Sequence, residues 1–163
     1  MSIMKAGVYA SFPAIAGFLG GILGGVISDA LLRRGYSLTV ARKTPIVAGM
    51  LIATSMIACN YVDAEWLVIA IMTLAFFGKG VGALGWAVVS DTSPKEISGL
   101  SGGVFNTIGN SAAITTPLVI GAVVAATGSF SGALVFVALN AIGAIGSYLF
   151  IVGEIKRLEL KPV

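Results

Sequence analysis

Residues 66–89 read WLVIAIMTLAFFGKGVGALGWAVV, a largely apolar run in which Lys79 is the single charged residue. About 20 apolar residues in a helix cross the bilayer's hydrocarbon core of roughly 30 Å, and such a run is too long for a strand. The sequence contains four further runs of this kind, at 12–32, 44–61, 102–126 and 130–152. The sequence therefore predicts an all-α polytopic membrane protein with five transmembrane helices, forming a single membrane domain over residues 1–163.

The composition of the chain also favours a membrane location. Of its 163 residues, 57% are hydrophobic and only 10% are charged, and the mean hydropathy is +1.01. A soluble domain carries about 25% charged residues, so this chain lacks the charges for a water-facing surface. The 22 glycines suit helices that pack closely in lipid. These figures exclude a disordered chain and a nucleic-acid binder, and the single Cys59 excludes a disulfide scaffold.

Prolines guide the expected helix boundaries. Ser11-Phe-Pro13 and Thr44-Pro45 each place a capping side chain beside an early helical proline, which predicts helix starts at these points. The stretch Ser93-Pro-Lys-Glu96 fits a capping box and predicts a short surface turn ahead of the fourth span. Pro117 lies inside that span and should bend it.

The basic residues predict the orientation, because loops rich in lysine and arginine stay in the cytoplasm. Alternate loops share one side of the membrane, and on one side they collect Arg33, Arg34, Arg42, Lys43, Lys95, Lys156, Arg157 and Lys161. The other side carries only Lys5, together with Asp63 and Glu65. We therefore expect a multi-pass protein of the cell inner (plasma) membrane with its N-terminus outside and its C-terminus in the cytoplasm.

An odd number of spans suggests an incomplete repeat, because membrane transporters built from repeats have matched halves. Five helices with an outside N-terminus fit a six-helix unit without its first helix, in which Met1 would be an internal methionine. No cleavable signal peptide is expected, since Met1–Ser11 has no basic segment followed by a short apolar one.

The first span ends in the pattern G-x-x-x-D-x-x-x-R-R-G over Gly25–Gly35. Asp29 and Arg33 are four residues apart and share a helical face. We predict that Asp29, Arg33 and Arg34 form a cytoplasmic latch that opens and closes as helices move. The alternative is an interfacial ion pair that only sets the topology. Upstream, glycines recur at every fourth position and form a stripe on one helix face: Gly17, Gly21 and Gly25. This stripe predicts a close contact with another helix, which either slides during function or packs statically.

Lys79 lies near the middle of its span, where a lysine costs at least about 2.5–3.5 kcal/mol on insertion scales. Such a residue should face a wet cavity or an anion. By the helical period of 3.6 residues, Ala83, Trp86 and Ser90 follow on the same face. We interpret this face as the wall of an anion cavity. The alternative is an ion pair between Lys79 and an acidic residue outside this chain.

Asn106 and Asn110 lie one turn apart on one face of the fourth span, near the depths of Trp86 and Lys79. Their amides can bind hydroxyl groups and carboxylates, although membrane asparagines often serve helix–helix contacts instead. We assign Asn140, in the fifth span, to that structural role. The sequence thus predicts a site for a hydroxylated anion, in which four side chains converge on a water-filled vestibule: Lys79, Trp86, Asn106 and Asn110.

These motifs resemble a known family. The pattern Gly25-x3-Asp29-x3-Arg33-Arg34-Gly35 resembles the loop motif of the major facilitator superfamily as repeated in its second half. The stretches Gly78–Trp86, Ser90–Glu96 and Gly99–Asn106 are similar to the anion:cation symporter family, in particular its glucarate/galactarate permeases. The resemblance covers essentially the whole chain. It implies helices 8–12 of a twelve-helix transporter, which is a partial C-terminal six-helix half of the major facilitator fold.

The resemblance implies proton-coupled symport of sugar-acid anions such as glucarate and galactarate by alternating access, with the proton as coupling ion and no other cofactor. Trp86 and Asn106 match positions that line the family's central substrate site, whereas Ala83 and Gly85 replace polar residues of some members. We hypothesise that Lys79 compensates by binding the second carboxylate of a diacid. The family's coupling carboxylates and its main substrate-binding arginine belong to the N-terminal half, so that missing half is the expected partner.

Other functions remain as alternatives. A membrane protease or acyltransferase would need histidine or a buried aspartate pair, but the chain has no histidine, and Asp29 and Asp91 are expected near the interface. We therefore expect no enzyme and no metal site. The chain could instead be an inactive truncated fragment, or a five-span scaffold subunit with no transport of its own.

Overall fold

The structure, a computed structural model, describes residues 3–160 and contains helices and loops but no strand within that range. Met1 and Lys161, which entered the expectations above, lie outside the described residues. In chain order the elements are α1 (Ile3–Arg33), α2 (Leu38–Ala53), the 3₁₀ helix η1 (Thr54–Tyr61), α3 (Glu65–Val81), α4 (Gly85–Thr92), the 3₁₀ helix η2 (Lys95–Ile97), α5 (Ser98–Thr127), α6 (Ser131–Gly146) and the π-helical turn η3 (Ser147–Ile151).

Five helical segments are long and apolar enough to cross a membrane, which confirms the all-α fold expected from the sequence. They are Gly7–Arg33, Leu38–Tyr61, Glu65–Thr92, Lys95–Thr127 and Ser131–Ile151. Every segment after the first combines two of the elements above. The protein is therefore a multi-pass membrane protein.

Two of the predicted helix starts are wrong. α1 passes through Pro13 and begins at Ile3, and α2 contains Pro45 and begins at Leu38. Ser37 is the N-cap of α2, because its side chain accepts a hydrogen bond from the backbone N–H of Val40 at 3.3 Å. This cap lies upstream of the Thr44-Pro45 pair, so the helix is already formed when the chain reaches the proline.

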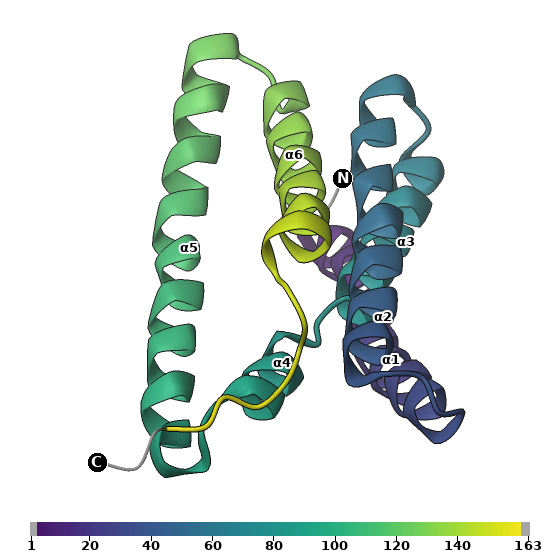
Figure 1. Ribbon diagram of the computed structural model, residues 1–163. Coiled ribbons are helices and arrows are strands. Elements are labelled where there is room, and N and C mark those ends of the chain that lie inside the picture. Colours follow the sequence, from purple (N-terminus) through teal and green to yellow (C-terminus); the bar gives the residue numbers. More distant parts are fainter. Residues whose placement is uncertain (1–2, 161–163) are drawn as a thin grey trace.

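The third span is two helices instead of the one continuous helix expected over 66–89. α3 ends at Val81, and α4 begins at Gly85 after a tight turn in which the N–H of Ala83 bonds to the carbonyl of Gly80. Glycines are dense here, and each lowers the helical preference of the chain. Beyond this break, α4 leaves the direction of α3 and runs toward the beginning of α5 (Figure 1).

α3 packs between α1 and α2 through direct backbone contacts. A Cβ atom added at Gly20 or Gly24 would collide with the backbone of α3, and one added at Gly49 would collide with Gly78 and Gly82. The predicted stripe of every fourth glycine is therefore only partly right: a Cβ on Gly17 would lie 3.4 Å from the carbonyl oxygen of Phe76, but nothing lies within 4 Å of a Cβ on Gly25. The contact follows the mixed three- and four-residue spacing of a real helix face.

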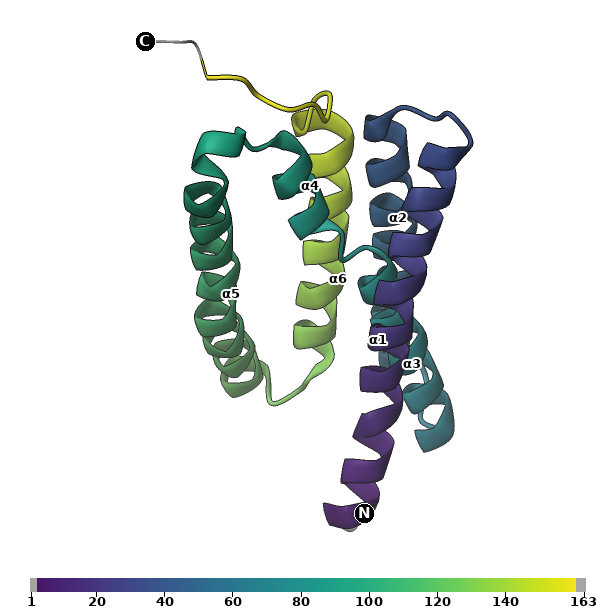
Figure 2. The same cartoon turned by 90° about the horizontal axis from the view of Figure 1, so that it is seen from below.

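α5 stands apart from the α1–α3 group, and α6 lies between them (Figure 1, Figure 2). No described residue of α5 is buried. The loop after α1, the turn before α5 and the C-terminal segment meet at one end of the bundle, which we call the basic end, while the α5–α6 loop lies at the other (Figure 2). The basic end thus gathers residues 33–43, 93–98 and 152–160.

Candidate functional site

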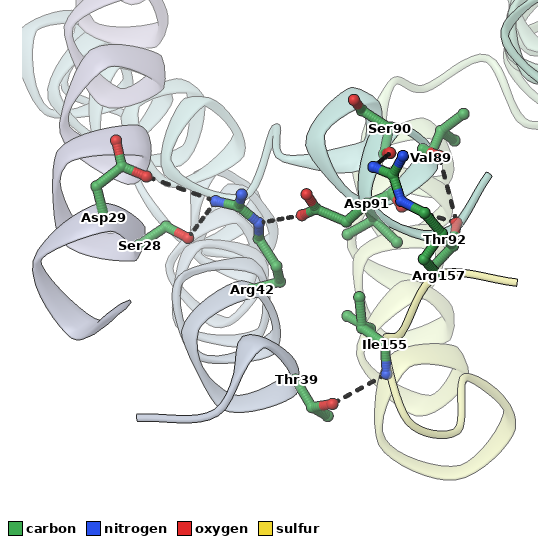
Figure 3. Close-up of polar contacts among 11 residues, drawn as sticks. Ser28, Asp29, Thr39, Arg42, Val89, Ser90, Asp91, Thr92, Ile155 and Arg157 are labelled. Carbon is green, nitrogen blue, oxygen red and sulfur yellow. Dashed lines mark hydrogen bonds and ion pairs between the residues drawn. The ribbon is translucent and has the colours of Figure 1, made fainter. Parts of the chain in front are cut away.

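Arg42, in the first turns of α2, joins α1 and α4 at the basic end (Figure 3). Its Nε donates a hydrogen bond to Oδ2 of Asp91 at 2.6 Å. Its Nη1 lies 3.7 Å from Oδ1 of Asp29 and donates to Oγ of Ser28 at 2.8 Å. The Arg42 side chain is only 13% exposed, so this guanidinium is held in place by two carboxylates and a hydroxyl.

This cluster differs from the predicted latch. Asp29 forms its ion pair with Arg42, whereas Arg33 and Arg34 are exposed and form no ion pair with any residue described by the structure. Sequence reasoning counted Arg42 as a loop charge because it started the helix at Thr44. The Ser37 cap was the signal that could have placed Arg42 on α2. A gating role for Asp29, Arg33 and Arg34 stays a prediction.

Asp91 was expected near the interface, and it lies at the end of α4 at the basic end (Figure 3). It does not face Asp29 as a catalytic pair would, because the Arg42 guanidinium stands between the two carboxylates (Figure 3).

The C-terminal segment fastens the same end. The backbone N–H of Ile155 donates to Oγ1 of Thr39 at 2.9 Å, and that of Leu158 donates to the carbonyl of Thr92 at 2.9 Å. Lys43 donates to the carbonyl of Val152, and Ile155 is buried. The segment therefore connects α2 to the end of α4.

Trp86 lies on α4 against the first turns of α5. Its ring meets the ring of Phe105 edge to face, with centroids 5.0 Å apart, and a Cβ on Gly102 would lie 3.4 Å from the indole. Asn106 is the next residue of α5 after Phe105. Within residues 3–160, Asn106 and Asn110 are exposed and form no hydrogen bond through their amides, which leaves both available to a ligand.

Lys79 lies elsewhere. It lines a cavity of ≈ 400 Å³ between α2, η1, α3 and α6, and its Nζ lies 5.5 Å from the centroid of the Phe76 ring. Trp86, Asn106 and Asn110 do not line this cavity. The sequence placed Lys79 and Trp86 on one face by assuming a continuous helix, and the break after Val81 separates them. The predicted common vestibule is therefore not assembled among the described residues.

Asn140 of α6 shares the cavity with Lys79, and sequence reasoning missed this. It was expected to bond to another helix, but its Nδ2 donates to the carbonyl of Phe136 in its own helix at 2.8 Å. No local pattern indicates which side of α6 faces α3, so the sequence offered no signal for this pairing.

The chain is similar to curated transporters. No family model matches it. A probable galactarate/D-glucarate transporter of Bacillus subtilis is 69% identical over 161 residues, which are 99% of this chain and 35% of that relative. A probable galactarate/D-glucarate transporter of Escherichia coli K12 is 63% identical over 163 residues, covering 100% of this chain and 36% of the relative.

A D-galactonate transporter of Escherichia coli O6:H1 is 42% identical over 159 residues, which are 97% of this chain and 36% of the relative. The chain thus spans about 35% of the length of the curated relatives that it matches.

Proposed function

Since this chain is homologous over essentially its whole length to part of the galactarate/D-glucarate transporters, we propose that it forms part of a secondary transporter for sugar-acid anions such as galactarate and glucarate. The observation that carries this proposal is 62–69% identity to five such transporters along nearly every residue of the chain. Uptake is coupled to protons and proceeds by alternating access, and the remainder of the transporter supplies the coupling carboxylates and the opposing half of the site.

In this transporter the chain corresponds to the C-terminal helices 8–12, in the inner membrane, with residue 3 toward the outside and residue 160 toward the cytoplasm. The charge distribution supports this orientation. Arg33, Arg34, Lys43 and Lys95 lie in the helix ends and connecting turns of the basic end, and regions rich in lysine and arginine next to a span stay in the cytoplasm.

The α4–α5 contact supplies this chain's share of the central site. Trp86 is 55% exposed and presents an aromatic surface, and the amides of Asn106 and Asn110 can both donate to and accept from sugar hydroxyls. The exposure of these three side chains supports this role. Side chains that contact the substrate or the opposing half of a transporter are expected to be solvent-exposed when that half is absent.

A chimera tests the proposal. In the Bacillus subtilis relative, the matching 161 residues are replaced by this chain, and the purified chimera is reconstituted in liposomes. With an inward proton gradient we expect uptake of labelled galactarate that stops when the gradient is dissipated. A chimera that elutes as a folded monodisperse protein but neither binds nor takes up any sugar acid would contradict the proposal.

Liposomes that contain only this chain test the alternative that it is a scaffold subunit or an inactive fragment. Alone it has no half against which to alternate, so we expect liposomes that contain only this chain to take up no galactarate. Uptake by the chain alone would refute the role assigned to the missing half.

A further inference from the structure

We infer that the cavity between α2, α3 and α6 is a carboxylate subsite whose polar groups are Lys79 and Asn140, and that it receives one carboxylate of a dicarboxylate sugar acid. This inference rests on the proposed function and deepens it, because it assigns the second acid group of the substrate to a place apart from the α4–α5 contact.

The charge of Lys79 is the first step of the argument. Lys79 lies in a membrane-spanning segment, and among the described residues that line its cavity none is acidic. Lys79 is exposed in the structure, and the Phe76 ring is the described group that faces its ammonium, at 5.5 Å. A cation–π contact offsets only part of the cost of placing this charge in hydrocarbon. An anion from outside the described residues must therefore complete the site.

Asn140 supplies the second polar group. One N–H of its Nδ2 is used by the carbonyl of Phe136 at 2.8 Å. The amide carries a second N–H, and its Oδ1 is an acceptor. A carboxylate at the cavity can thus bind the Lys79 ammonium and the free N–H of Asn140 together, while a neighbouring hydroxyl donates to Oδ1.

The remaining walls are apolar and include Met50, Met56, Ala75 and Val137. Such walls lower the local dielectric and strengthen an ion–ammonium contact. The cavity of ≈ 400 Å³ lies in the range of small-molecule pockets, and the two methionines can adapt to the ligand. The site therefore suits a small organic anion.

The break between α3 and α4 explains why the substrate would be a diacid. It places Lys79 and Trp86 in two separate environments, although only seven positions separate them. A molecule with a carboxylate at each end of a hydroxylated chain presents two acid groups to recognise. A monoacid such as galactonate lacks the second one, so its binding should not depend on the Lys79 cavity.

The experiment compares a diacid with a monoacid in the chimera described above. Affinities for galactarate and galactonate are measured by calorimetry for the parent chimera, Lys79→Gln and Asn140→Leu. We expect Lys79→Gln to weaken galactarate binding about tenfold or more, as the loss of a charged hydrogen bond predicts, and galactonate binding by less than about twofold. Asn140→Leu should weaken galactarate binding by a smaller factor and leave galactonate unaffected.

Lys156→Gln is the matched control. Lys156 lies in the exposed C-terminal segment with its Nζ 3.0 Å from Glu154, so removing its charge should change neither affinity. Lys79→Arg keeps the charge and should retain more galactarate affinity than Lys79→Gln.

Two outcomes overturn the inference. Unchanged galactarate binding by Lys79→Gln would place the carboxylate elsewhere. Equal weakening of both acids would show that Lys79 neutralises a carboxylate of the transporter itself. A parent chimera that binds no sugar acid would refute the proposed function instead, before any variant is compared.

Discussion

Arg42 shows how one side chain can hold three helices together. Its guanidinium reaches Asp91 on α4 and Asp29 and Ser28 on α1, while its backbone belongs to α2. Several donors in a planar fork allow one arginine to serve partners in different directions, which a lysine cannot do. The pairing stabilises the basic end, and it ties the short α4 to the α1–α2 pair.

We predict that Arg42→Gln lowers the free energy of unfolding by about 1–3 kcal/mol, because Asp91 and Ser28 lose a charged hydrogen-bond partner in a partly buried place. Thermal melting of the purified chimera measures the change. Arg33→Gln removes the same charge from the same end, but Arg33 is exposed and forms no ion pair within residues 3–160, so its melting temperature should stay within error. Equal losses for both variants would restore Arg33 as the partner of Asp29.

Trp86 offers a second test at this scale. We predict that Trp86→Ala weakens galactarate binding by the chimera about tenfold or more, because an exposed aromatic ring is lost from the proposed central site. Trp66→Ala is the matched control, since Trp66 is 72% exposed at the beginning of α3, far along the chain from this contact. Galactarate affinities of the two variants are measured by calorimetry. Equal loss of affinity in both variants would count against the assignment of Trp86 to the substrate site.

The sequence indicated candidate side chains for the site, but only the tertiary structure shows how they are grouped. Trp86 packs against Phe105, the residue before Asn106, and a joint role of Trp86 and Asn106 stays a prediction. Lys79 was grouped with them because a helical period of 3.6 residues was extended past Val81, where α3 in fact ends. Helical periodicity predicts a shared face only while the helix continues. Several glycines also occur inside α1, which is unbroken, so the presence of glycines alone did not predict the break after Val81.

At the scale of the helices, close packing depends on which glycines face a neighbour. α1 carries adjacent glycines with opposite environments: a Cβ on Gly24 would lie 3.0 Å from Cα of Val81, whereas one on Gly25 has nothing within 4 Å. Backbone atoms cannot move aside as a flexible side chain can. The α1–α3 contact therefore requires glycine at 24 and tolerates alanine at 25.

We predict that Gly24→Ala destabilises the chimera by about 1–3 kcal/mol through overpacking, while Gly25→Ala changes stability little. The same methyl group is added one position apart on the same helix, so differences in helix preference cancel. Melting temperatures in one detergent provide the comparison. A larger loss for Gly25→Ala would mean that α1 is rotated relative to α3 from the arrangement described here.

At the scale of the whole molecule, the bundle is open on the side of α5. None of the described residues of α5 is buried, and its neighbours are α6, α4 and η2. An exposed polar stripe with Asn106 and Asn110 is costly against lipid, where polar groups lack partners. The chain spans about 35% of the length of its relatives, and this openness agrees with the proposal that it packs against the rest of a transporter.

The orientation gives a prediction at this scale. Cys59 is the single cysteine, so Cys59→Ser provides a background without thiols. In right-side-out vesicles, a membrane-impermeant maleimide should label Ser129→Cys, in the α5–α6 loop, and should not label Lys156→Cys until the vesicles are opened. The background alone should remain unlabelled. The reverse pattern would invert the assigned topology.

The sequence by itself determined the membrane class, the five spans and the collection of basic residues at one end, because hydropathy and loop charge are sums over neighbouring residues. Only the tertiary structure decided that Arg42 holds Asp29, that α4 leaves the line of α3, and that Lys79 shares a cavity with Asn140. These three features depend on how helices that are distant in the chain are rotated and how closely they approach. The local sequence pattern determines the apolar length of each helix, but it does not determine which neighbouring helix each face contacts.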